Sequence, residues 1–179
     1  SGIHTITLGT GAAGNFIRNN AGDGIEINAS GTLIVNNDVI TGNVTEGTGD
    51  GRAGIDLNSP GGNTLIVLAS VISNNQGDGI EVDLTGSGTL VSINDSAIQF
   101  NSRDGVEWMD RGIGLNQLNV NGSALGSNII SDNGFRGLDI EVAGFNPTSR
   151  VSINQTDILR NGQEGVYVVL SSDANQTQG

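Results

Sequence analysis

One eleven-residue pattern recurs along this chain, and it limits the possible folds more than any other feature. Five segments share the pattern I-x-x-N-x-x-x-G-[ILV]-x-[hydrophobic] and align without gaps, at 17–27, 72–82, 98–108, 130–140 and 158–168. A sixth copy spans 39–57 if 44–50 is an insertion. The glycines of the six copies lie 30, 25, 26, 32 and 28 residues apart: Gly24, Gly54, Gly79, Gly105, Gly137 and Gly165. Self-similarity of this period indicates stacked repeats.

Each repeat contains three short runs with strand character, which are 25–27, 32–35 and 39–41 in the first copy. Gly, Asn and Ser separate the runs, and no window shows the 3.6-residue period of a helix. Three such strands cannot bury their own apolar face, but stacked copies form a continuous interior. The sequence therefore predicts an all-β parallel solenoid of about six coils, on the order of 30 Å long.

The chain reads as one domain over 1–179. Residues 1–14 are expected to form an N-terminal cap or first strand, and 171–179 a polar tail. The Ser-Gly start and the lack of a capping helix suggest a segment of a longer protein. Open solenoid ends expose strand edges, so end-to-end self-association is expected as well.

Charge restricts the partners. The chain has seven basic residues, all of them Arg, and 19 acidic residues, which gives a net charge of −12. This charge repels nucleic acid and anionic lipid and favours a cationic partner. No apolar run approaches the length of a membrane span, and the absence of Cys excludes disulfides and thiolate metal sites.

The Asn and Gly of the pattern have expected structural roles. Asn precedes the glycine by four residues in the five ungapped copies, so the amides should stack at one corner and hydrogen-bond along the rod. These residues are Asn20, Asn75, Asn101, Asn133 and Asn161. The glycine should supply either a positive φ or a close approach of neighbouring coils.

From about residue 15 to 170, the pattern resembles the repeats of right-handed parallel β-helix proteins of the pectate-lyase-like superfamily. The resemblance implies a right-handed helix and an extracellular or cell-surface location. In carbohydrate-active members, sugar lies along the outer face of one sheet, with acidic residues and often calcium. The chain lacks the Asp-Pro-His, Asp-Asp and Gly-His-Gly motifs of epimerases and polygalacturonases, and His4 is its one histidine. The resemblance therefore transfers no catalytic residue.

Strand alternation places one residue of each glycine-led strand outward. The predicted outward row, a candidate ligand-binding surface, is Glu26, Asp56, Glu81, Glu107, Asp139 and Tyr167. Carboxylates at strand spacing repel one another or recruit a cation, and oxygen ligands favour calcium. The candidate metal ligands are Asp78, Glu81, Asp83, Asp104 and Glu107. The alternative is that these acids are solvated residues that protect the sheet from aggregation.

An arginine among acids gives a candidate catalytic group, as a lyase base or a clamp for an acidic sugar. The group is Asp104, Glu107, Arg136, Asp139 and Glu141. It is equally compatible with a structural ion pair. Trp108 is expected inside the core rather than as a sugar platform, and the outward Tyr167 is the better stacking residue.

Two longer connections, 44–51 and 111–127, are expected to project from the coils, where they either bind a partner or are idle. The leading functional hypothesis is a non-catalytic extracellular module that serves as a scaffold or carbohydrate-binding surface, with calcium as a potential cofactor. The alternatives are a polysaccharide lyase and a self-assembling rod segment.

Overall fold

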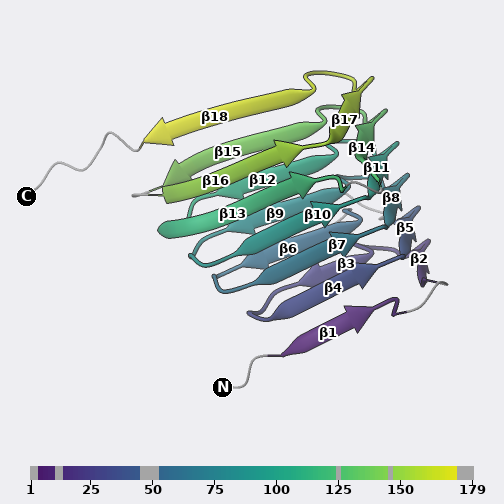
Figure 1. Ribbon diagram of the computed structural model, residues 1–179, viewed down its shortest axis with the longest axis horizontal. Coiled ribbons are helices and arrows are strands. Elements are labelled where there is room, and N and C mark those ends of the chain that lie inside the picture. Colours follow the sequence, from purple (N-terminus) through teal and green to yellow (C-terminus); the bar gives the residue numbers. More distant parts are fainter. Residues whose placement is uncertain (1–3, 11–13, 45–52, 124–125, 145–146, 173–179) are drawn as a thin grey trace, which may run out of the picture.

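In the part of the chain that the structure describes, eighteen strands form six stacked coils of three strands each (Figure 1). This computed structural model describes residues 4–10, 14–44, 53–123, 126–144 and 147–172. The strands are β1 Thr5–Leu8, β2 Phe16–Arg18, β3 Ile25–Ile27, β4 Thr32–Asn36, β5 Val39–Thr41, β6 Ile55–Ser59, β7 Thr64–Leu68, β8 Val71–Ser73, β9 Ile80–Leu84, β10 Leu90–Asn94, β11 Ala97–Gln99, β12 Val106–Asp110, β13 Gly114–Asn121, β14 Asn128–Ser131, β15 Leu138–Gly144, β16 Pro147–Asn154, β17 Thr156–Leu159 and β18 Val166–Ser172.

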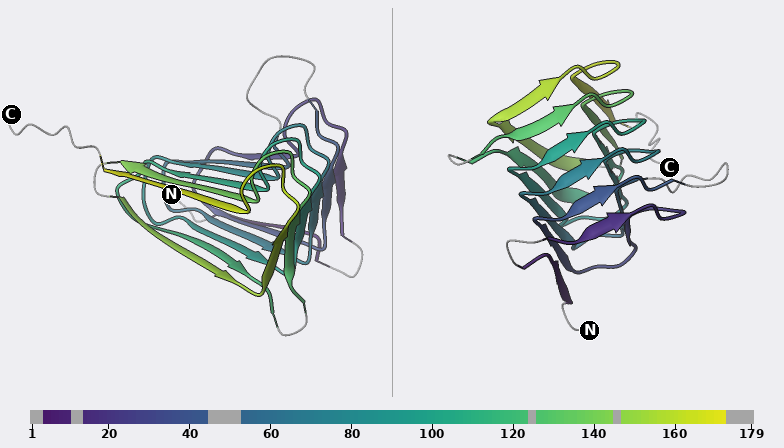
Figure 2. Two further views of the ribbon diagram at one scale, coloured as in Figure 1. Left: turned by 90° about the horizontal axis from the view of Figure 1, so that it is seen from above. Right: turned by 90° about the vertical axis from the view of Figure 1, so that its right-hand side faces the viewer.

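The strands build three six-stranded parallel sheets. Sheet A has the order β1-β4-β7-β10-β13-β16, sheet B β2-β5-β8-β11-β14-β17, and sheet C β3-β6-β9-β12-β15-β18. Viewed along the stack, the long strands of sheets A and C meet at one side and the short strands of sheet B close the other (Figure 2). The predicted parallel β-helix with three strands per coil is confirmed. The described residues contain no helix, so none of them forms a helical membrane span.

Equivalent repeat positions pair across every coil boundary. In sheet A, for example, Ile6, Leu33 and Leu65 are register neighbours in successive coils. This pairing places β1 in the sheet, so part of 1–14 is a first strand. It also places β13 in sheet A, so the expectation that 111–127 projects is wrong for Gly114–Asn121. The inserted segment 45–52 lies outside the described residues, as does the tail from 173.

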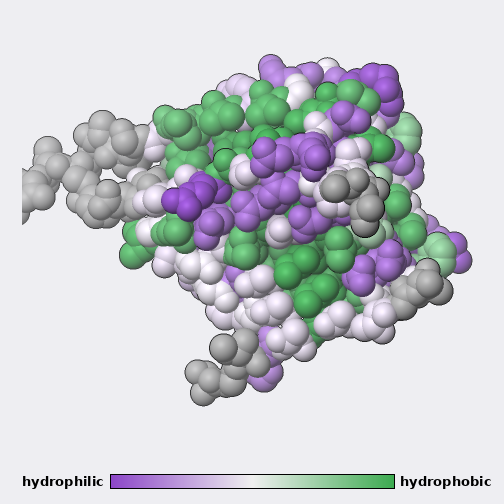
Figure 3. All heavy atoms as spheres, viewed as in Figure 1, coloured by the Kyte–Doolittle hydropathy of each residue, from purple (hydrophilic) through white to green (hydrophobic). Residues whose placement is uncertain are grey.

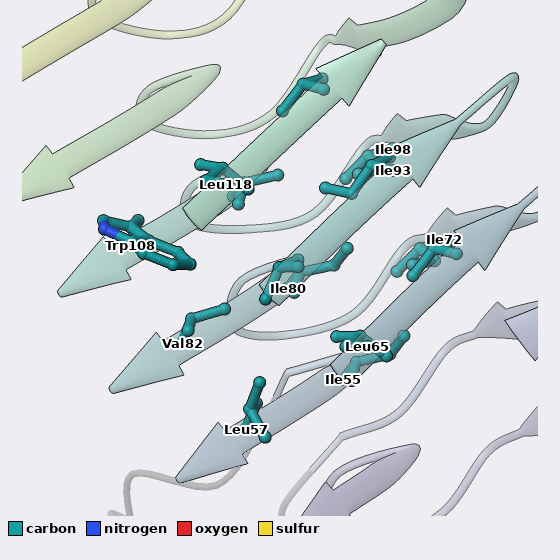
Figure 4. Close-up of a cluster of buried hydrophobic side chains, with 14 of the residues drawn as sticks. Ile55, Leu57, Leu65, Ile72, Ile80, Val82, Ile93, Ile98, Trp108 and Leu118 are labelled. Atoms are coloured by element: carbon teal, nitrogen blue, oxygen red, sulfur yellow. The ribbon is translucent and has the colours of Figure 1, made fainter. Parts of the chain in front are cut away.

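The core lies between the three sheets and follows from strand alternation (Figure 4). Inward residues of the middle coils, such as Ile80 and Val82, have no exposed surface. Trp108 is also fully buried, as expected, and its Nε1 donates a hydrogen bond to Ser149 Oγ at 3.3 Å. The indole thus fills the core, and its polar atom has a partner.

The asparagine corner forms the predicted stack between sheets B and C. The side-chain Nδ2 of each Asn donates to Oδ1 of the Asn in the following coil, at 2.9–3.0 Å. The stack, called the amide ladder below, is Asn20, Asn43, Asn75, Asn101, Asn133 and Asn161. Its second member, Asn43, was not predicted, because the insertion at 44–50 separates it from its glycine. All six coils therefore share this corner.

The pattern glycine is required for close approach. A Cβ on Gly79 would lie 2.5 Å from the Gly105 carbonyl oxygen and 2.4 Å from Ile98 Cγ2. The positive-φ glycines of the described residues are at other positions, so the first of the two expected explanations is wrong here. The glycine row therefore lets the amide ladder and sheet C pack against each other.

Candidate functional site

The outer face of sheet C carries the predicted row of acidic residues in continuous register. Glu26 pairs with Asp56, Asp56 with Glu81, and Glu81 with Glu107. Glu107 then pairs with Asp139, and Asp139 with Tyr167. These residues, Glu26, Asp56, Glu81, Glu107, Asp139 and Tyr167, are called the carboxylate row below. Five carboxylates thus occupy neighbouring strands.

A second set of carboxylates lies in the turns that lead into sheet C. Asp78 Oδ1 accepts a hydrogen bond from the backbone N–H of Asp104 at 2.8 Å. Asp104 Oδ1 accepts one from the backbone N–H of Arg136, and Asp23 Oδ1 one from that of Ala53. Each aspartate therefore ties its own coil to the next one through its Oδ1.

The row and the turns together make two three-carboxylate clusters. In one cluster, oxygens of Asp78, Glu81 and Glu107 all lie within 4.8 Å of one another. In the other, the same holds for Asp104, Glu107 and Asp139. Glu107 is shared, so the two clusters adjoin. Two oxygens bound to one calcium ion lie at most about 5 Å apart, and hence either cluster has the dimensions of a calcium site.

The first cluster is deeply placed and poorly neutralised. Asp78 is fully buried, and its Oδ2 accepts no hydrogen bond in the described structure. Among the described residues, its ion-pair partner is Arg103, whose Nη1 lies 3.1 Å from that Oδ2. Burial raises the pKa of Asp78 to about 7 although Arg103 opposes this, and burial together with Asp78 and Asp56 raises the pKa of Glu81 to about 8. One arginine does not offset three carboxylates.

Other members of the carboxylate row are also buried without full compensation of their charge. Asp56 Oδ1 is buried without a hydrogen bond among the described residues, and burial with the nearby Asp23 raises the pKa of Asp56 to about 6. Burial also raises the pKa values of Asp104 and Glu107. Because desolvation is the largest cause at each of these groups, the row favours either protons or a bound cation at neutral pH.

Asp83, a predicted metal ligand, lies outside both clusters. Arg111 Nη1 donates to both of its carboxylate oxygens, at 2.9 and 2.8 Å. A hollow of about 220 Å³ lies between Arg103 and Arg111, with Glu81, Asp83 and Glu107 in its lining. A second hollow of about 340 Å³ also includes Asp83 and is lined by Asn28, Asn58, Ser59, Pro60 and Thr85. The outer face of sheet C is therefore hollowed on both sides of Asp83.

Arg136 contacts two carboxylates and an aromatic ring. It forms ion pairs with Asp139 and with Glu164, the latter at 3.2 Å, and its guanidinium lies 4.0 Å from the centre of the Tyr167 ring. The structure thus pairs this arginine with two of the acids around it. Glu141 lies one outward row further along, beside Met109 and Val169 in register. The structure thus brings Asp104, Glu107 and Asp139 together and leaves Glu141 apart.

Sequence reasoning missed Arg103 and Arg111, the two arginines that flank the first cluster. They precede and follow β12, the strand that carries Glu107. An alignment of the repeats contains one signal for them, since Arg occupies each of these two positions in the fourth coil and not in the third. The ion pairs that they form across coils depend on side-chain reach, which the repeat pattern does not encode.

Comparison of the chain with protein-family models, with curated proteins and with solved structures finds no match. The parallel β-helix is therefore established by the structure, and function has to be argued from the site itself.

Proposed function

We propose that this chain is a non-catalytic β-helix module of the extracellular space or cell surface, whose sheet C binds calcium and, next to the cation, a polysaccharide. The observation that carries the proposal is the first cluster, Asp78, Glu81 and Glu107, with its partly unsatisfied oxygens. Calcium prefers such hard oxygen ligands, and its double charge would offset the repulsion that raises the carboxylate pKa values.

The hollows around Asp83 support the glycan part of the proposal. Their linings mix arginine, amide and hydroxyl groups on an extended strand surface, and these groups suit the hydroxyls and carboxylates of an acidic sugar. The resemblance to the pectate-lyase-like superfamily implies the same kind of surface, with sugar along one sheet and calcium beside it. The location outside the cell rests on this resemblance.

Calorimetric and thermal titration with calcium tests the cation site. Binding to the folded chain should release heat and raise the melting temperature by mass action, and the apparent affinity should increase from pH 6 to pH 8.5 as calcium displaces protons from Glu81. The double variant Glu81→Gln/Glu107→Gln should lose the thermal gain. Asp157→Asn, which removes a carboxylate from the outer face of β17, should keep it.

Absence of heat and of a thermal shift at millimolar calcium would contradict the cation site. A glycan array with and without calcium then tests the second half, and Arg111→Gln should weaken binding of acidic glycans more than that of neutral ones. The lyase alternative is tested on any glycan that binds, by the ultraviolet absorbance of unsaturated products. Such an absorbance would replace the binding module with an enzyme.

A further inference from the structure

Sheet A differs from the other two sheets in its charge. In the described ranges of the chain, the six strands of sheet A contain no Asp or Glu, whereas those of sheet C contain eight and those of sheet B one. Arg150 is the one charged residue in the strands of sheet A. The outer face of this sheet is therefore nearly uncharged, in a chain whose net charge is −12.

The strands of sheet A are also apolar on both of their faces in the second and third coils. In β4, Leu33 and Val35 are buried in the core, and Ile34 points outward between them. In β7, Ile66 and Leu68 point outward in the same way. A strand with one solvated face normally alternates apolar and polar residues, as β9 of sheet C does, whereas strands covered on both faces read as continuous apolar runs. The outer face of sheet A thus has the composition of a covered surface.

The outward apolar side chains form one contiguous patch in the middle coils. Ile34 and Ile66 are register neighbours, and Leu68 lies two residues further along β7. Leu90, in β10, is the register neighbour of Thr64. These partly exposed residues, Ile34, Ile66, Leu68 and Leu90, are called the apolar patch below, and Figure 3 shows hydrophobic side chains gathered over β4 and β7. Because the patch lies on the outer face of the second to fourth coils, any further coils would extend sheet A rather than cover the patch.

We propose that the apolar patch packs against the same patch of a second copy of this chain, and that sheet A thereby forms a symmetric dimer. A broad, uncharged and apolar sheet face needs a partner that shares these properties, and sheet A of another copy has them. Two copies that each carry a charge of −12 repel one another, and contact through sheet C would bring their carboxylate rows together. In a two-fold dimer the same surface occupies both sides of the interface, so a face without carboxylates is required on both.

Sheet A also has the area that such a contact needs. Six strands about 4.8 Å apart, with about five residues each at about 3.3 Å per residue, make a face of roughly 450 Å². Two such faces packed together would bury roughly 900 Å², which lies near the lower limit for a specific interface and suits a weak, reversible dimer. Sheet B is also almost free of carboxylates, but most of its strands have three residues, so its face is narrower.

The dimer is independent of the proposed cation site. Sheet C forms a different side of each coil (Figure 2), so dimerisation through sheet A leaves both carboxylate rows open. A polymeric glycan that reached both rows would bind more tightly than to a single copy. Because the charge on the rest of each copy is repulsive, association should strengthen as salt is added.

Sedimentation velocity of the 179-residue chain in calcium-free buffer tests the dimer. The average mass of the wild-type chain should rise with concentration toward that of two copies. Ile66→Glu, which adds a carboxylate to each side of the interface, should weaken dimerisation by at least about tenfold. The matched control is Val71→Glu, which adds the same charge to the same coil on the outer face of β8 and should dimerise like the wild type.

A second variant keeps the test independent of folding. The double variant Ile66→Ser/Leu68→Asn gives β7 the outward residues of its register neighbours, Ser92 and Asn94, which the same sheet already accommodates. It should therefore fold, as circular dichroism would show, and it should remain monomeric at concentrations where the wild-type chain dimerises.

Single-cysteine spin labels locate the interface, since the chain has no other Cys. Labels at Ser92→Cys, beside the apolar patch, should lie closer together in the dimer than labels at Glu141→Cys on sheet C. A wild-type chain that stays monomeric at every concentration would overturn the proposal. So would a Val71→Glu variant that dissociates while Ile66→Glu dimerises, a folded double variant that still dimerises, or the reverse order of the two label distances.

Discussion

Two stacks of polar side chains run along this β-helix in the same register, and they differ in what their groups can exchange. In the amide ladder, each side chain donates to one neighbour and accepts from the other, so every added coil supplies a partner. In the carboxylate row, ionised side chains only accept, so each coil that adds a carboxylate adds a repulsion. One repeat geometry therefore stabilises the fold at the corner and strains it on sheet C.

Burial makes the amide ladder and the carboxylates beside the carboxylate row differ further. Asn75 and Asn101 are almost completely buried and have partners for both amide atoms. Asp78 is buried as deeply, yet it lies beside Glu81 and Glu107, and Arg103 is its one ion-pair partner among the described residues. A buried amide that is fully bonded needs nothing further, whereas a buried carboxylate cluster needs protons or a cation.

The largest expected loss of stability comes from placing a carboxylate in the amide ladder. Asn101→Asp removes the donor to Asn133 Oδ1 and places a carboxylate against that oxygen. The expected loss is about 3 to 5 kcal/mol at pH 7, since the charge is buried without compensation, and it should shrink near pH 4. Urea unfolding at both pH values measures it. The exposed Asn154→Asp should cost under about 1 kcal/mol, and equal costs for the two variants would contradict the buried ladder.

Removing one amide should have a smaller effect that depends on its place in the ladder. Asn101→Ala leaves groups of Asn75 and Asn133 without partners, so a loss of about 1 to 3 kcal/mol is expected. Asn20→Ala, at the exposed first coil, should cost less because only Asn43 loses a partner. Chemical unfolding of both variants tests the gradient. Two losses near zero would mean that water replaces the amides.

Much of this contrast could be predicted from the sequence, because both stacks follow from periodicity. The spacing between Asn101 and Gly105 recurs in every ungapped copy, and the alternation around Glu107 fixes which residues face outward. Register therefore follows from the repeat once a parallel solenoid is assumed. Asn43 was not predicted as a ladder member, because an insertion interrupts the spacing between this asparagine and its glycine. Its strand and its glycine were both recognised.

Neutralisation of the row could not be predicted in the same way. Arg103 and Arg111 reach across a coil boundary to Asp78 and Asp83, and the length and rotamer of an arginine side chain are independent of the repeat. The sequence predicted Asp83 as a metal ligand, whereas the structure pairs it with Arg111 on both oxygens. Which carboxylates remain uncompensated thus depends on side-chain geometry.

The strain in the row should appear as a pH dependence of stability. The carboxyl pKa values of Asp56, Asp78 and Glu81 are raised by folding to about 6, 7 and 8. The folded chain therefore binds more protons than the unfolded one above about pH 4.5, and stability should decrease as the pH rises to 8. After allowance for solvent screening, the loss is about 2 kcal/mol, or about 4 to 8 °C in melting temperature. Calorimetry in calcium-free buffers measures it, and a flat profile would contradict the strain.

The smallest expected effect isolates one member of the row. Glu81→Gln resembles the protonated side chain, so it should leave stability unchanged at pH 5 and increase it by about 1 kcal/mol at pH 9, where the wild-type carboxylate is ionised. The control Glu141→Gln removes a carboxylate from the same sheet, in a row where its register neighbours are Met109 and Val169. It should change stability by under about 0.5 kcal/mol at either pH.

A gain for Glu81→Gln at pH 9 that calcium abolishes would link the repulsion to the proposed cation site, because the ion offsets in the wild type what the substitution removes in the variant. If neither variant responds to pH, Glu81 is solvated like an isolated surface acid. The carboxylate row would then serve only to keep sheet C from pairing with other sheets. The two stacks would then differ only in that the amide ladder is buried and the carboxylate row is exposed to solvent.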